Sequence, residues 1–111
     1  MLPKKNRLTK KEDFTRVYRK GLFFSEGELS LKLVKNNLSE SRFGFPIEKK
    51  YFKLATKRNK IKRILRETVH LNLNRMKKGF DIAVFCRKKG EIEFDDIRIA
   101  MEKLLKKSKL I

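Results

Sequence analysis

The clearest helical period in the chain lies between residues 57 and 72. Placed at about 100° per residue, its apolar positions gather on one side and its basic positions on the other. The first side holds Ile61, Ile64, Leu65, Thr68, Val69 and Leu71, and the second holds Arg58, Asn59, Lys62, Arg63 and Arg66. This pattern predicts a helix that buries one face and leaves a cationic face in solvent.

A second helix is predicted near the amino terminus. Thr9 followed by Glu12 has the spacing of a capping box, so this helix is predicted to begin at Thr9. Gly21 is placed to end it in a left-handed conformation. Apolar residues recur within it at helical spacing, namely Phe14, Val17 and Tyr18.

A third helix is predicted close to the carboxyl end. Asp95 and Asp96 stand where negative charge favours a helix amino terminus. An apolar stripe follows, made of Ile97, Ala100, Met101, Leu104 and Leu105. A turn is expected before this helix, at residues 88–90.

Two segments alternate apolar and polar residues with the period of a strand. Residues 29–33 predict one half-buried strand, and residues 43–47 predict a second strand antiparallel to it. Residues 23–25 are a candidate for a further short strand. Residues 80–86 are almost uniformly apolar, as in a strand covered on both faces. A helix between residues 47 and 80 implies a crossover connection rather than a hairpin.

The predicted order is helix, two or three strands, helix, strand, helix, which favours an α+β sandwich with a mixed sheet. A chain of 111 residues is expected to form a single domain over residues 1–111. Residues 1–8 are basic and contain Pro3, so we expect them to form a flexible arm.

The formal net charge of +18 indicates a strongly anionic partner, either nucleic acid or an anionic membrane. No apolar run approaches the roughly 20 residues of a transmembrane helix, and the amino terminus has no apolar stretch of a signal peptide. The lone Cys86 cannot form an internal disulfide. We therefore expect a cytoplasmic protein with no membrane partner.

The basic helix face favours nucleic acid. Arg58, Lys62 and Arg66 are spaced four residues apart, where like charges repel. A solvated face would interleave acidic residues, but the first acid after the basic run is Glu67. A polyanion along this face would turn the repulsion into attraction.

No set of residues for catalysis by the protein itself is evident. His70 is most simply a packed or surface histidine, and Cys86 lies within a predicted buried strand. One His and one Cys cannot build a zinc site. A set of carboxylates could in principle gather around magnesium, although helix capping and solvated loops explain them more simply: Asp81, Glu91, Glu93, Asp95 and Asp96.

The string from Arg58 to Glu67, RNKIKRILRE, closely resembles the RNR signature helix of the bacterial ribonuclease P protein component. Three further segments resemble that family in the same order: NRLTKKEDFTRVYRKG, RFGFPIEKK and GFDIAVFCRK. The resemblance spans nearly the whole chain.

The resemblance implies a subunit of a ribonucleoprotein endonuclease that removes the 5′ leader from precursor tRNA. It also implies a left-handed βαβ crossover. The implied partners are the ribonuclease P catalytic RNA and precursor tRNA, with no protein partner required. The RNA subunit would carry the active site and its magnesium ions, and the protein alone would hold none.

The resemblance also implies roles for particular residues. The catalytic RNA would contact Arg58, Asn59, Lys60, Lys62, Arg63 and Arg66. The leader cleft would involve Phe14, Tyr18 and Lys32. Composition alone favours Phe14 and Tyr18 as core residues, and the resemblance reverses that preference for Tyr18. Lys60 departs from the motif, which has arginine there, and Lys32 stands where relatives often carry an aromatic residue.

Two other functions fit part of the pattern. A small structural RNA-binding protein, such as a ribosomal protein, fits the charge and size equally well. A DNA-binding protein is disfavoured because neither a helix-turn-helix pair nor a basic zipper is evident.

Overall fold

The computed structural model describes residues 2–87 and 93–111. Its elements in chain order are the 3₁₀ helix η1 (Lys4–Asn6), α1 (Lys11–Lys20), β1 (Leu22–Glu26), β2 (Leu29–Lys35), β3 (Arg42–Gly44), α2 (Ala55–Asn72), the 3₁₀ helix η2 (Leu73–Arg75), β4 (Phe80–Cys86) and α3 (Phe94–Lys107). This order confirms the predicted arrangement, with β1 as the additional short strand. The predicted turn at residues 88–90 and Glu91 lie outside the described residues.

The four strands form one mixed sheet in the order β1-β2-β4-β3. β1 pairs with β2 and β2 pairs with β4, both antiparallel, whereas β3 pairs with β4 in parallel. The predicted antiparallel pairing of residues 43–47 with residues 29–33 is therefore wrong. The parallel pairing arises because α2 carries the chain back across the sheet before β4 begins, so β3 and β4 run in the same direction.

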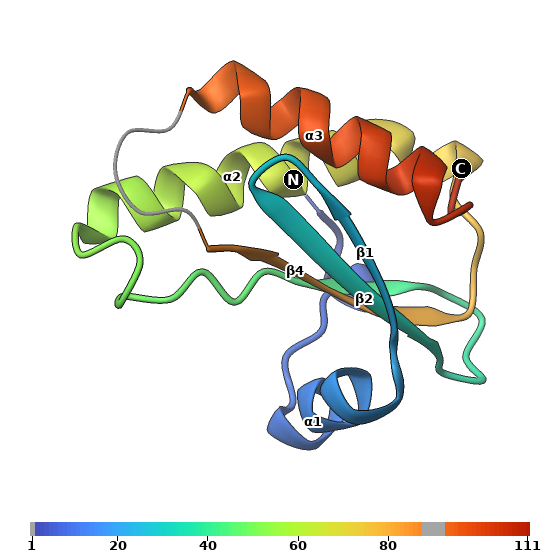
Figure 1. The fold of residues 1–111 in the computed structure, drawn as a ribbon. Coiled ribbons are helices and arrows are strands. Elements are labelled where there is room, and N and C mark those ends of the chain that lie inside the picture. Colours follow the sequence, from blue (N-terminus) through green and yellow to red (C-terminus); the bar gives the residue numbers. More distant parts are fainter. Residues whose placement is uncertain (1, 88–92) are drawn as a thin grey trace.

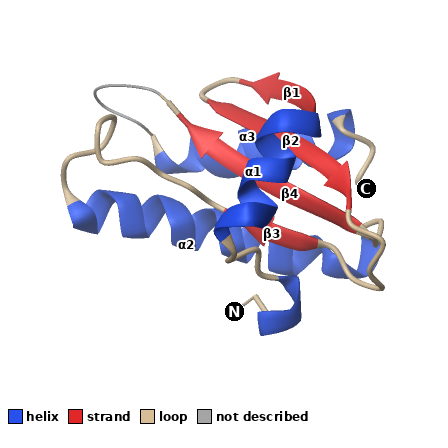
Figure 2. Ribbon diagram, turned by 90° about the horizontal axis from the view of Figure 1, so that it is seen from below, coloured by secondary structure: helices blue, strands red, loops and turns tan. Residues whose placement is uncertain are grey.

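Helices cover both faces of this sheet, with α2 and α3 on one face and α1 on the other (Figures 1 and 2). Successive side chains of β4 point to opposite faces of the sheet, so this strand contributes to the hydrophobic cores on both faces. Ile82, Val84 and Cys86 belong to the larger core under α2 and α3, while Ala83 and Phe85 belong to a smaller core under α1. This confirms the prediction that residues 80–86 form a strand buried on both faces.

The β3-α2-β4 crossover is left-handed. In Figure 1 both strands run from right to left, α2 lies above the sheet, and β4 lies nearer the viewer than β3. Figure 2 shows the same strand order from below. The handedness that the family resemblance implied is thus present.

The ends of α1 differ from the prediction. The helix begins at Lys11 with Lys10 as its N-cap, and no side-chain capping bond forms, so the capping box of Thr9 and Glu12 is absent. The preceding Leu8 is buried and its amide donates to the carbonyl of Phe43 at 2.8 Å, which holds the chain extended against the sheet. Gly21 has φ −72°, so it ends the helix without the predicted left-handed conformation.

The amino-terminal segment packs against the body of the protein rather than forming the expected flexible arm. Leu2, Asn6 and Leu8 are buried. The Asn6 side chain donates to the carbonyl of Ser41 at 2.9 Å, and Arg7 forms an isolated parallel bridge with Phe43. Apolar residues within the basic sequence therefore anchor residues 2–8 beside β3.

The predicted apolar stripes of α2 and α3 face each other and the sheet. Those of α3 are all buried, as are Ile61, Leu65, Thr68 and Val69 of α2. Ile64 is half-buried, and Leu71 is 80% exposed at the margin of the apolar arc, just before α2 ends. Within the described residues, no helix has the length and apolar character needed to cross a membrane.

Candidate nucleic-acid interface

The outward face of α2 carries most of the predicted catalytic-RNA contacts. Ile61, Leu65 and Val69 are fully buried, and they fix the rotation of the helix about its axis. The opposite side chains therefore project into solvent: Asn59, Lys60, Arg63 and Arg66 are exposed, and Arg58 and Lys62 are half-buried. The structure thus brings the predicted set onto one helix, where four of the six side chains are exposed.

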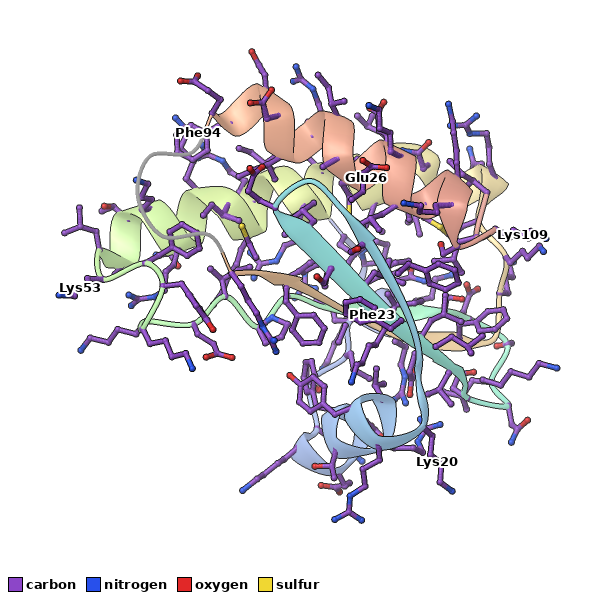
Figure 3. The ribbon with its side chains drawn as sticks, in the orientation of Figure 1. Lys20, Phe23, Glu26, Lys53, Phe94 and Lys109 are labelled. Atoms are coloured by element: carbon purple, nitrogen blue, oxygen red, sulfur yellow. The ribbon has the colours of Figure 1, made fainter. Side chains whose placement is uncertain are left out.

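Two members of this set already make contacts within the protein. Nη1 of Arg58 donates to the carbonyls of Phe52 at 2.8 Å and Lys53 at 2.9 Å, which ties down the loop before α2. Nζ of Lys60 lies 4.1 Å from the ring centroid of Phe94. Figure 3 places Phe94 at the start of α3, above the first turns of α2. Arg58 and Lys60 therefore have structural roles, whereas Lys62, Arg63 and Arg66 make no comparable contact with the described residues 2–87 and 93–111.

A groove of about 510 Å³ opens between α1 and the sheet, and we call it the α1 groove. Its lining residues come from α1, both strands of the β1–β2 hairpin, the segment after β3, and the end of β4: Tyr18, Phe23, Lys32, Glu48, Phe85 and Arg87. Its volume lies within the range of about 300 to 1,000 Å³ common for ligand sites.

Tyr18 forms the floor of the α1 groove together with Phe85. Their ring centroids are 5.5 Å apart, and Tyr18 remains 40% exposed. The pKa of the Tyr18 hydroxyl is raised, first by burial and then by the negative charge of Glu48, which outweigh the opposing charge of Arg87. The phenol therefore stays protonated at neutral pH and keeps a hydrogen-bond donor at the groove.

Phe14 is half-buried and does not line the groove. Its ring centroid is 6.2 Å from that of Tyr18, and it packs in the smaller core. The ring lies over Gly44, where an added Cβ would sit only 2.2 Å from Cζ of Phe14. Glycine at this position of β3 thus makes room for Phe14, and Phe14 in turn supports Tyr18.

Cations flank the aromatic floor. Nζ of Lys32 donates to the backbone carbonyl of Tyr18 at 3.0 Å, near the carboxyl end of α1. The guanidinium carbon of Arg87 lies 5.3 Å from the ring centroid of Phe85. The α1 groove therefore combines π-faces with positive charge, which are the two features that bind single-stranded nucleic acid.

A buried charge cluster also joins α1 to the sheet, near the start of β4. The carboxylate of Asp81 in β4 is fully buried and accepts two bonds from Arg42 at 2.8 and 2.7 Å, one from Asn36 at 2.9 Å, and one from Arg16 of α1. Burial alone would raise the pKa of Asp81, but these bonds and the two guanidinium charges outweigh it and lower the pKa. Bonding to Asp81 also raises the pKa of Arg42. The α1 helix is therefore fixed to the sheet by charge-assisted hydrogen bonds.

The structure brings Tyr18 and Lys32, two of the residues predicted for the leader site, into one groove. The other residues that line this groove were not predicted: Phe23, Glu48, Phe85 and Arg87. The sequence did contain a signal for Phe85 and Arg87. Ala83 and Phe85 alternate along β4 and point to the same face of the sheet, and Arg87 continues this alternation directly after the strand ends. Phe23 and Glu48 gave no comparable signal, because their neighbours in the groove are distant in sequence.

The acidic residues considered for magnesium do not form a metal site in the described part of the chain. No group of three or more His, Cys, Asp or Glu residues close enough to hold a metal ion occurs there. Asp81 is surrounded by Arg42, Arg16 and Asn36, so its lone pairs are already occupied.

The protein has a mixed sheet, a cationic face on α2 and an aromatic groove between α1 and the sheet. These features define a class of small, basic α+β RNA-binding proteins. Residues 2–109 match the family model described as Ribonuclease P. The chain is 36% identical over 107 residues to the ribonuclease P protein component of Clostridium botulinum (strain Loch Maree / Type A3), covering 95% of this chain and 96% of that protein.

Solved structures agree with the family model. The ribonuclease P protein of Staphylococcus aureus superposes with a TM-score of 0.86 at 29% identity, covering 95% of this chain and 96% of that one. The ribonuclease P protein of Thermotoga maritima gives a TM-score of 0.79 at 33% identity, covering 91% of this chain and 96% of that one. The chain belongs to the ribonuclease P protein family, which decides against the ribosomal and DNA-binding alternatives.

Proposed function

We propose that this protein is the RNA-binding subunit of a ribonucleoprotein endonuclease that removes the 5′ leader from precursor tRNA. The observation that carries the proposal is the combination of a family match over residues 2–109 with a cationic face on α2 that points away from the core. The protein would act in the cytoplasm with the catalytic RNA and precursor tRNA as its partners, and no further protein would be required.

In this proposal the outward face of α2 binds the catalytic RNA. Lys62, Arg63 and Arg66 would contact phosphates, and Asn59 would add a polar contact from the same face. Each phosphate contact releases condensed counterions, so binding would weaken as salt rises. Lys60 and Arg58 would contribute while also holding α3 and the loop before α2 in place.

The α1 groove would receive the single-stranded leader. An unpaired base can stack on Tyr18, and Lys32 and Arg87 can attract the phosphates on either side of it. Stacking suits a protein that accepts leaders of many sequences, since every base has a π-face. Phe14 would support Tyr18 from the smaller core rather than contact the leader itself.

The chemistry would be performed by the RNA subunit and its magnesium ions. The protein's contribution is to bind, orient and neutralise charge around the precursor. Asp81 would hold none of these ions, because its carboxylate is buried and already bonded to Arg42 and Asn36.

Reconstitution tests this function. The protein is added to catalytic RNA and precursor tRNA at low magnesium concentration, and leader release is measured. We expect cleavage that increases with the protein, and no cleavage by the protein alone. A protein that binds the RNA without stimulating cleavage would contradict the proposal.

A further inference from the structure

Phe23 is a large apolar side chain left open to solvent on a defined face of the sheet. It is 58% exposed, and it lies on β1, the outer strand. In the β1–β2 hairpin it stands directly opposite Lys32. Residues opposite each other in an antiparallel pair point to the same side of the sheet. Since Lys32 reaches the carbonyl of Tyr18 in α1, Phe23 also points to the α1 side.

The position of α1 leaves this part of the sheet uncovered. The helix packs mainly over β2 and β4, and the outer strand extends beyond it. Figure 3 shows Phe23 on the side of the sheet that faces α1. Phe23 consequently forms the outer wall of the α1 groove, across from Tyr18 and Phe85.

The groove therefore has aromatic surface on two sides, and its charged lining residues are two cations, Lys32 and Arg87, and one carboxylate, Glu48. Lys32 lies beside Phe23 across the hairpin, and Arg87 lies over Phe85. An apolar peptide would gain nothing from these cations, and a second copy of a chain with net charge +18 would be repelled by them. A nucleotide suits both the aromatic surfaces and the cations, because its base is apolar on its faces and its phosphate is anionic.

We propose that Phe23 stacks on an unpaired base of the leader and so forms a second stacking position beside Tyr18. Phe23 and Tyr18 would each hold one base, with Lys32 neutralising the phosphate that joins the two nucleotides. This inference rests on the proposed function, since it assigns a further residue to the leader-binding groove.

Binding measurements on the reconstituted particle test the role of Phe23. Affinity is measured for precursor tRNA and for mature tRNA, which has no leader. Phe23→Ala is expected to weaken precursor binding by about 5- to 100-fold, corresponding to one lost stacking contact, and to leave mature tRNA binding unchanged. Phe23→Tyr should restore the affinity, because it retains a π-face.

Leu22 offers a matched control. It is the neighbouring residue on β1, it is 65% exposed, and it points to the opposite face of the sheet, opposite Leu33. Leu22→Ala should leave both affinities unchanged. Equal losses for Leu22→Ala and Phe23→Ala would overturn the inference, because they would indicate a general effect of altering β1.

Fluorescence provides a readout that does not depend on cleavage. The chain has no tryptophan, so Phe23→Trp introduces a single reporter at this position. Precursor tRNA should quench its emission, mature tRNA should not, and Leu22→Trp should respond to neither. If the emission of Phe23→Trp is not quenched although the particle binds the leader normally, the role of Phe23 is overturned and the proposed function is not. A wild-type particle that binds precursor and mature tRNA equally would instead overturn the proposed function.

Discussion

The outward face of α2 and the α1 groove are built in opposite ways. The α2 face is formed by side chains of one helix, of which Asn59, Lys60, Arg63 and Arg66 are exposed and Arg58 and Lys62 are half-buried. The α1 groove draws its lining from α1, the β1–β2 hairpin, the segment after β3 and the end of β4. It therefore exists only while those elements keep their relative positions.

This difference predicts how the two surfaces respond to change. Removing an exposed cation such as Arg63 from α2 deletes one contact and leaves its neighbours in place. The groove depends on the attachment of α1 to the sheet, which rests on the Asp81 cluster and on the packing of Phe14 over Gly44. A change at either point alters the whole groove, so its effects should be cooperative.

The largest expected effect comes from Asp81→Asn. The substitution leaves the guanidinium groups of Arg42 and Arg16 without their shared carboxylate. We expect a loss of about 3 kcal/mol in the free energy of unfolding, at the lower end of the range for a broken buried ion pair, since both arginines retain some contact with solvent. Urea denaturation measures this loss.

Asp95→Asn is the matched control for that variant. Asp95 pairs with Arg98 at 2.9 Å, but its side chain is 81% exposed. Exposed pairs contribute about 0 to 1 kcal/mol, so this variant should be close to wild type. Equal losses at Asp81 and Asp95 would show that burial of the carboxylate is not what makes the cluster important.

Lowering the pH should protonate the Asp81 carboxylate and so reduce the free energy of unfolding progressively. The folded-state pKa of Asp81 lies below its ordinary value of 3.8, so its ionised form stabilises the fold. That contribution is fully present above pH 3.8 and is lost as pH falls through the lowered folded pKa. Unfolding free energy measured across this range should fall less steeply for Asp81→Asn than for wild type. If the unfolding free energies of wild type and Asp81→Asn fell in parallel with pH, the stabilising role of ionised Asp81 would be contradicted.

Gly44→Ala should disturb the groove through Phe14. The new methyl group would lie 2.2 and 2.5 Å from two ring carbons of Phe14, so the ring must move. We expect a cost of about 1 to 3 kcal/mol in unfolding free energy, typical of overpacking, together with weaker precursor binding. Catalytic-RNA binding through α2 should be retained.

A double-mutant cycle with Phe14→Leu isolates this contact. If the ring is the source of the clash, the double variant should be more stable than the sum of the two single losses predicts. Additive losses would mean that Gly44 is required for another reason.

The smallest effects on stability are expected on α2, where Arg63 and Arg58 should respond differently to substitution by alanine. Arg63→Ala should leave stability unchanged within about 0.5 kcal/mol, as expected for a surface substitution. It should also reduce the salt dependence of catalytic-RNA binding by about 0.7 to 0.9 in slope per lost phosphate contact. Arg58→Ala should additionally destabilise the protein by about 1 to 2 kcal/mol, because two backbone acceptors lose their donor. Identical stabilities for the two variants would contradict the structural role of Arg58.

The α2 face could be predicted because it depends on one local period. Residues 57–72 alone specify which side of the helix is buried. On that side Ile64 is only half-buried and Leu71, at the margin, is exposed, and on the predicted solvent side Arg58 and Lys62 are half-buried. The stripe of α3 and the buried strand β4 were predicted for the same reason.

Predictions that depended on long-range pairing were less reliable. The sequence of residues 43–47 indicates a strand but does not specify its partner, and β3 pairs with β4. The capping box did not form, because α1 begins at Lys11 with Lys10 as its N-cap, whereas the box requires Thr9 at that position. Phe23 could not be assigned to the groove until the hairpin register placed it opposite Lys32.

The most direct test of two independent surfaces compares Arg63→Ala and Tyr18→Ala in one set of binding measurements. Each variant is titrated with catalytic RNA alone, and then the reconstituted particle is titrated with precursor and mature tRNA. We predict that Arg63→Ala weakens binding to catalytic RNA, and that Tyr18→Ala weakens only the binding of precursor that carries a leader. If both variants lose the same interaction, the division between α2 and the α1 groove is wrong.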